Sequence, residues 1–139
     1  MTNQALALVS DINSAVIATI ESSNNPNAVG RAGERGLMQI LNKRIWDEIV
    51  NDIGNQNWTW EDHAFEGRIN RFVGNHYINV MIPRMLRRYR IPDTIETRIA
   101  SYNWGIGRVR DAYRTHNENW LEHAPRVTRN YIERYKRGQ

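Results

Sequence analysis

Apolar residues recur every three or four positions along most of this 139-residue chain, and no segment sustains the alternation of a β-strand. This is the spacing of helices that turn one face toward a core. We therefore expect an all-α fold, compact and built as a single domain over residues 1–139, since a chain of this length rarely divides. The predicted helices span about residues 14–23, 42–53, 64–89, 93–103, 108–113 and 125–135.

Glycine, proline and asparagine mark where these helices should begin and end. Residues 24–36 hold three glycines, three asparagines and one proline, and we expect an irregular loop or a small β element there. Pro83 predicts a kink or a break within the third helix. Asp93 with Glu96 predicts a capping box. We also expect a break at residues 105–107 and Pro125 in the first turn of the last helix.

Several classes of protein are excluded by what the sequence lacks. Without cysteine, the chain has no disulfide scaffold, no thiolate metal site and no cysteine nucleophile. No apolar run approaches the ~20 residues of a membrane-spanning helix. The apolar stretch at residues 5–9 follows no basic residue and is interrupted by Asp11, so we expect no secretory signal. The four histidines are scattered, and we expect neither a metal site nor a cofactor.

Basic residues gather in the C-terminal part of the chain. Residues 1–83 carry six basic and nine acidic side chains, whereas residues 84–139 carry thirteen basic and six acidic ones. The C-terminal part could therefore bind an anionic polymer, such as nucleic acid, a phospholipid surface or a bacterial cell wall. It could also form an ordinary solvated helix face, so charge alone leaves the partner open.

Glu21 differs from the other carboxylates in its predicted surroundings. It ends the first apolar helix and directly precedes the loop at residues 24–36. The negative end of the helix dipole disfavours a carboxylate, and apolar neighbours disfavour it further, so both raise its pKa. A carboxyl group with a raised pKa can act as a general acid near neutral pH. Taken alone, Glu21 could also be an exposed residue at a helix end.

A series of motifs extends over about residues 11–135. In order, they are Glu21–Ala28 with Gly33 and Gly36–Ile40, then Asn70, Gly74 and Tyr77, then Ser101–Val109, and lastly Pro125–Ile132. In content and order the series resembles the soluble lytic transglycosylase (SLT) domain family. The resemblance implies the fold of the α+β lysozyme-like superfamily. It also implies cleavage of the β-1,4 bond between N-acetylmuramic acid and N-acetylglucosamine in peptidoglycan.

The resemblance further implies how the reaction would proceed. Glu21 would be the one catalytic residue, protonating the leaving oxygen and then accepting the proton of the muramoyl C6 hydroxyl. That hydroxyl would close on C1 and give a 1,6-anhydro product without consuming water. The implied substrate-binding residues are Ser22, Met38, Gln39, Tyr102, Asn103 and Tyr131.

These residues would contribute in different ways. Gln39 and Asn103 would hydrogen-bond to the sugar. Met38 and Tyr102 would form an apolar wall against it and keep Glu21 protonated. Tyr131 would hydrogen-bond near Glu21 and orient it.

The sequence departs from the family pattern around this set. Gly30 replaces a serine common in the first loop, and Asn24 replaces an aromatic residue. Trp104 and Ile106 stand where a small residue and a proline are usual, and Val127 where many members carry a glutamate. These departures leave Glu21 in place but affect the expected sugar subsites.

Three other functions stay open. A hydrolase on the same fold would need a second carboxylate to activate water, and Glu34 is the nearest candidate in the sequence. A helical nucleic-acid-binding protein would use the arginine-rich part instead. A wall-binding module would have no activity at all.

Among these partners we expect peptidoglycan glycan strands rather than nucleic acid. The basic part could add electrostatic contact with an anionic wall or membrane surface, and we expect a monomer. A wall-cleaving domain without an export signal suits a bacteriophage lysin. Such a protein would be made in the host cytoplasm and would act on the periplasmic wall after holin release or as a virion component.

Overall fold

The computed structural model describes residues 9–54 and 56–139, and over these the chain is mostly helical. Of the apolar stretch at residues 5–9, only Val9 belongs to the described residues. The all-α prediction is confirmed. The elements are α1 (Ser14–Ser22), α2 (Lys43–Ile53), α3 (Trp60–His63), α4 (Gly67–His76), η2 (Tyr77–Met81), α5 (Ile82–Arg88), α6 (Ile95–Trp104), α7 (Ile106–His116), η3 (Asn117–His123) and α8 (Arg126–Gly138).

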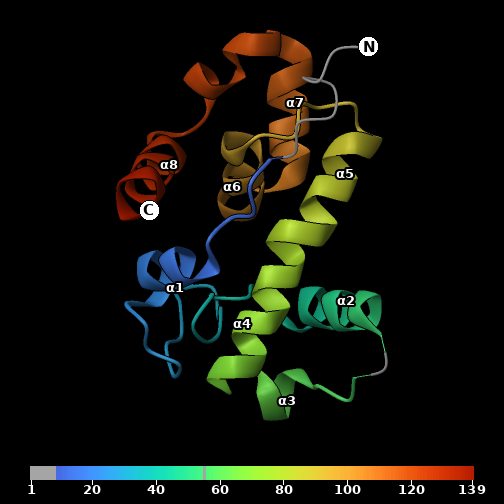
Figure 1. The fold of residues 1–139 in the computed structure, drawn as a ribbon, viewed down its shortest axis with the longest axis vertical. Helices are drawn as coiled ribbons and strands as arrows, with labels where there is room; N and C mark the ends of the chain where they lie inside the picture. The colour runs from blue at the N-terminus through green and yellow to red at the C-terminus, as the bar shows by residue number, and fades with distance from the viewer. Residues whose placement is uncertain (1–8, 55) are drawn as a thin grey trace.

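One long helical column organises the other elements. Helices α4, η2 and α5 follow one another directly, with α1, α2 and α3 near one end and α6 and α7 beside the other (Figure 1). Helix α8 packs against α6 and α1, so that Gly138 lies against Val16 near the opposite end of the chain. Trp46, Leu86 and Ile99 are among the fully buried side chains between these helices. None of the described helices has both the length and the apolar character needed to cross a membrane.

The column is regular except at η2, which is a π-helical turn. The interruption expected at Pro83 therefore lies just before that residue, which is in the first turn of α5. Proline has no N–H to donate to the preceding turn, so the regular hydrogen-bond series cannot continue through it. The wider turn carries Tyr77 and Asn79, which point to different parts of the molecule.

Several predicted boundaries need correction. The capping box predicted from Asp93 and Glu96 is wrong: Thr94 Oγ1 accepts from the Thr97 backbone N–H at 3.1 Å, and Thr97 Oγ1 accepts from the Thr94 N–H at 2.9 Å. Helix α7 begins at Ile106, so Gly105 alone separates it from α6. Pro125 is the N-cap of α8 rather than part of its first turn. The short elements α3 and η3 were not predicted.

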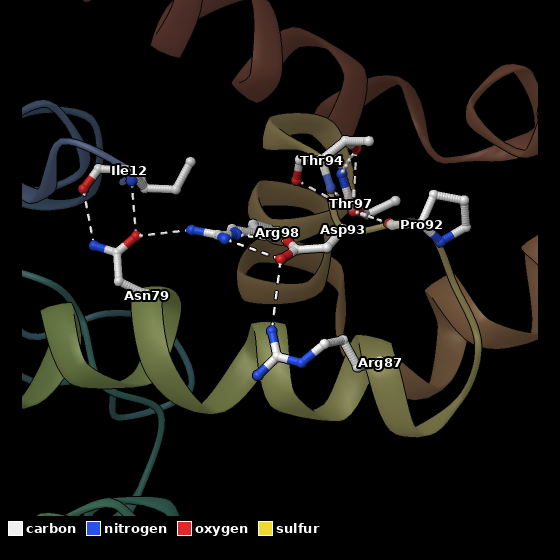
Figure 2. A network of polar contacts seen from close by, with 8 residues as sticks. All are labelled: Ile12, Asn79, Arg87, Pro92, Asp93, Thr94, Thr97 and Arg98. Atoms are coloured by element: carbon white, nitrogen blue, oxygen red, sulfur yellow. Dashed lines mark hydrogen bonds and ion pairs between the residues drawn. The ribbon is translucent and has the colours of Figure 1, made fainter. Parts of the chain in front are cut away.

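Asp93 does not cap α6, because its carboxylate belongs to a polar network around buried Arg98 (Figure 2). Arg98, 6% exposed, donates to both Asp93 carboxylate oxygens, at 2.7 and 3.0 Å. Its third nitrogen reaches Asn79 Oδ1 at 3.4 Å, and Asn79 also bonds both backbone groups of Ile12, at 2.7 and 3.0 Å. The network therefore joins α6, η2 and the segment before α1.

The loop between α1 and α2 is ordered by a buried side chain of α4. Asn70 donates to the carbonyls of Arg35 and Ala64, at 3.0 and 2.8 Å, and accepts from the Met38 N–H at 2.8 Å. Antiparallel bridges pair Arg35 with Val29 and with Ile40. Residues 24–36 thus form an irregular loop that has isolated β-bridges at Arg35 rather than a strand, and Asn70 fixes this loop over α4.

Candidate active site

Glu21 lies in the last turn of α1, and the C-cap residue of this helix, Ser23, has a left-handed conformation. The hydroxyl of Tyr131, on α8, donates to Glu21 Oε2 at 2.8 Å. Burial raises the pKa of Glu21 to about 7, and the Glu34 charge adds to the increase, while the Tyr131 hydrogen bond and Arg134 oppose it. A carboxyl group with this pKa can both give and take a proton near neutral pH.

Glu21 opens onto a cleft of about 250 Å³ between the α1–α2 loop and α6. None of the described residues lining the cleft is arginine, lysine or histidine. The lining residues are Glu21, Glu34, Gln39, Ile40, Leu41, Ile45, Tyr77, Ser101, Tyr102, Asn103, Trp104 and Gly105. The cleft thus combines two carboxyl groups and two side-chain amides with apolar and aromatic side chains.

Gln39 is oriented by the loop that carries it. Its backbone is left-handed, with φ of 52°, and its side-chain Nε2 donates to the carbonyls of Ala28 and Gly36, at 3.1 and 3.0 Å. Both amide protons are therefore used within the loop. Oε1 is left as the polar atom that can accept a hydrogen bond from a ligand.

Tyr102 and Met38 act as a pair, although only Tyr102 lines the cleft. The Tyr102 hydroxyl donates to the Met38 carbonyl at 2.6 Å. The Met38 side chain is fully buried against Gly74 and is not among the lining residues, so it lies in the core rather than on a surface open to sugar. Burial and the nearby Glu21 charge hold the pKa values of Tyr102 and Tyr131 well above their usual range, so both hydroxyls remain donors.

Asn103 and Ser22 differ in their access to the cleft. Asn103 lines it, and its Oδ1 accepts from Thr128 Oγ1 at 2.8 Å, which leaves its amide N–H groups for a ligand. Ser22 Oγ donates to the Ala18 carbonyl at 3.0 Å, within its own helix. Ser22 is half-buried and not among the lining residues.

The cleft also includes Tyr77, for which no binding role was predicted from the sequence. Tyr77 lines the cleft and packs on Tyr102, with ring centroids 5.8 Å apart. Its spacing from Gly74 was the signal that could have identified it. Trp104, one of the departures from the family pattern, lines the cleft as well. Trp58 and Trp60 instead pack against Phe72 and Trp46, away from it.

Proton transfer is the chemistry that this arrangement supports. One carboxyl group of raised pKa is held by a hydroxyl donor at the edge of a cleft that offers amide groups and aromatic surfaces. Within residues 9–54 and 56–139, no group of three or more His, Asp or Glu side chains is placed to hold a metal ion.

Comparisons with known proteins agree with this geometry. The family model described as the transglycosylase SLT domain matches residues 10–123, which include Glu21 and the cleft but not Tyr131. Over 100 residues the chain is 34% identical to membrane-bound lytic murein transglycosylase F of Marinobacter nauticus, covering 72% of this chain and 18% of that protein.

The fold is also similar to a solved structure. The 70 kDa soluble lytic transglycosylase of Escherichia coli matches with a TM-score of 0.76 and 21% identity, covering 94% of this chain and 21% of the other. This likeness confirms the lysozyme-like fold. The chain spans about a fifth of the length of either relative.

Proposed function

The chain belongs to the transglycosylase SLT domain family, and we propose from this that it cleaves peptidoglycan as a lytic transglycosylase. The observation that carries the proposal is Glu21, a carboxyl group with a pKa of about 7 that faces the cleft and accepts a hydrogen bond from Tyr131. The bond cleaved would be the β-1,4 bond between N-acetylmuramic acid and N-acetylglucosamine.

Glu21 would act twice in this reaction. As the protonated acid it gives its proton to the glycosidic oxygen, and the bond between that oxygen and C1 of the muramoyl residue breaks. As the carboxylate it then accepts the proton of the muramoyl C6 hydroxyl, whose oxygen bonds to C1. A pKa near 7 suits both steps, because neither protonation state is strongly disfavoured near neutral pH.

The other residues would bind and orient the groups that react. Gln39 Oε1 accepts from the glycan, the Asn103 amide donates to it, and the Tyr102 ring forms part of the wall beside them. Met38 contributes through its carbonyl, which holds the Tyr102 hydroxyl. Tyr131 positions the Glu21 carboxyl group, and Ser22 supports the end of α1.

The test is to identify the products formed from purified peptidoglycan. Wild type should release 1,6-anhydromuropeptides, detected by mass spectrometry, and Glu21→Gln should lower the rate by about 10²–10⁴-fold because the general acid is lost. Glu133→Gln makes the same change at an exposed position of α8 and should leave the rate unchanged. A Glu21→Gln rate equal to that of wild type would contradict the proposal.

A hydrolase is the second candidate, because Glu34 lines the same cleft as Glu21. Two carboxyl groups flanking a glycosidic bond are the usual requirement for hydrolysis. The same product analysis decides: reducing-end muropeptides alone would replace the transglycosylase by a hydrolase.

The charge of α8 supports a contact between the protein and the cell wall. Arg126, Arg129, Arg134 and Arg137 are exposed on α8 and could contact an anionic wall. A bacteriophage origin, action on the periplasmic wall and a monomeric state stay predictions.

A further inference from the structure

Glu34 occupies a space that a side chain at residue 30 would otherwise fill. A Cβ atom placed on Gly30 would lie 2.5 Å from Glu34 Oε1 and 2.6 Å from Gln39 Oε1. Both oxygens therefore border the same small volume in front of the Gly30 backbone. The absence of a side chain at this position, one of the departures from the family pattern, is what leaves room for the Glu34 carboxylate.

The loop holds Glu34 in this place. The Gly30 N–H donates to the Glu34 carbonyl at 2.8 Å, and the Ala32 N–H donates to Glu34 Oε1 at 2.8 Å. No arginine, lysine or histidine of the described residues pairs with the Glu34 carboxylate, in contrast to Asp52 and Asp93. The carboxylate thus enters the cleft without a counter-charge.

Gln39 contributes the second acceptor atom, Oε1, to the same volume. Its amide protons are used by Ala28 and Gly36, so Oε1 has only acceptor capacity to offer there. Glu34 Oε1 accepts from the Ala32 N–H and, as a carboxylate oxygen, can accept a second hydrogen bond in this volume. A hydrogen-bond donor from a ligand would satisfy both.

We propose that Glu34 and Gln39 form an acceptor pair that binds a hydrogen-bond donor of the glycan in the cleft, which makes Glu34 a specificity-determining residue. The identity of the ligand as a glycan rests on the proposed function. The donor is a hydroxyl or amide N–H on an N-acetylated sugar, or an ammonium group on a de-N-acetylated one. Because Glu34 is charged and unpaired, the ammonium form should bind more tightly.

Binding can be measured apart from catalysis by using Glu21→Gln as the background. The probes are chito-oligosaccharides, either fully N-acetylated or partly de-N-acetylated, titrated by calorimetry. Adding Glu34→Ala should weaken binding of both probes by about 10–100-fold, as expected for a lost hydrogen bond to a charged group. Glu34→Gln keeps an acceptor oxygen but no charge, so it should abolish any preference for the de-N-acetylated probe.

Gly30→Ala tests the same volume from its other side. The added methyl group would displace both oxygens. This variant should therefore lose affinity to a similar degree as Glu34→Ala, although it still contains the Glu34 side chain. Thermal unfolding of each variant separates binding defects from misfolding, and Glu133→Gln is the matched control on an exposed helix face. Unchanged affinity of folded Glu34→Ala and Gly30→Ala for both probes would overturn the proposal.

Activity on peptidoglycan distinguishes this role from water activation. With Glu21 intact, Glu34→Ala should raise KM about tenfold or more and leave the proportion of anhydro products unchanged. A selective loss of reducing-end products would show that Glu34 activates water, and would overturn the binding role. If wild type released no anhydromuropeptides, the proposed function would fail, whereas the oligosaccharide titration would still decide the role of Glu34.

Discussion

Two regions of the molecule bury charge in opposite ways. Around Arg98, the guanidinium is bonded twice to Asp93 and once to Asn79 (Figure 2). Around Glu21, the carboxyl group has a hydroxyl donor but forms no ion pair with any of the described residues, and a second carboxylate lines the same cleft. A buried charge that is fully paired holds helices together, whereas one left without a counter-charge has a shifted pKa and can exchange protons. The comparison separates the part that stabilises the fold from the part that is reactive.

Arg98→Ala should change the free energy of unfolding most, because it removes the central side chain of the Arg98 network. Removing one partner leaves the Asp93 carboxylate partly buried and unpaired, which should lower the free energy of unfolding by about 3–5 kcal/mol. Denaturant titration measures this value. Arg87→Ala is the control, because exposed Arg87 approaches the same carboxylate only to 3.9 Å and should cost at most about 1 kcal/mol. Equal costs for the two variants would show that Arg98 does not stabilise the fold through this network.

Glu21→Gln should raise the free energy of unfolding rather than lower it, and the size of this increase should depend on pH. The folded protein holds a proton on Glu21 up to pH about 7, whereas the unfolded chain loses it near pH 4.5, so wild-type stability falls as pH rises between these values. Glutamine does not titrate. The variant should therefore match wild type near pH 4 and be more stable by about 3 kcal/mol at pH 8.

Urea titrations at the two pH values test this expectation. Glu133→Gln should show no pH-dependent gain, since that residue is exposed. If Glu21→Gln were no more stable than wild type at pH 8, the carboxyl group would not be desolvated as the structure indicates.

Tyr131→Phe should have the smallest effect and would refine the description of the reactive region. The Tyr131 hydrogen bond favours the charged form of Glu21, so its removal should raise the Glu21 pKa further. The basic limb of the pH–rate profile should move upward by about one pH unit. Tyr135→Phe, on the same helix but bonded to the Asn13 N–H, should leave that limb in place. A downward shift for Tyr131→Phe would contradict the assigned role.

The sequence predicts the fold better than it predicts the details that depend on tertiary partners. Apolar spacing identifies α1 and α2, because each buries one face, whereas α6 buries five consecutive residues, 97–101, and has no such face. It misplaces the cap of α6, since Asp93, a good capping residue, is taken instead by Arg98. The 3-10 element η3 has no apolar repeat to reveal it.

The candidate site shows the same division. Glu21 could be singled out from its position at a helix end and from the motif that follows. Its bond to Tyr131 joins residues 110 positions apart, and only the motif resemblance suggested it. Glu34 lines the cleft from a loop in which Gly33, Gly36 and Gln39 have left-handed backbones, a geometry that spacing alone does not encode.

The π-helical turn η2 connects these two regions through the register of one helix. Tyr77 faces the cleft and packs on Tyr102, while Asn79, two residues later, joins the Arg98 network. Each residue of an α-helix turns the next by roughly 100°. A single-residue deletion within η2 that restored a regular helix would therefore rotate one of these side chains away from its partners. The length of this turn in residues is therefore constrained by both regions at once.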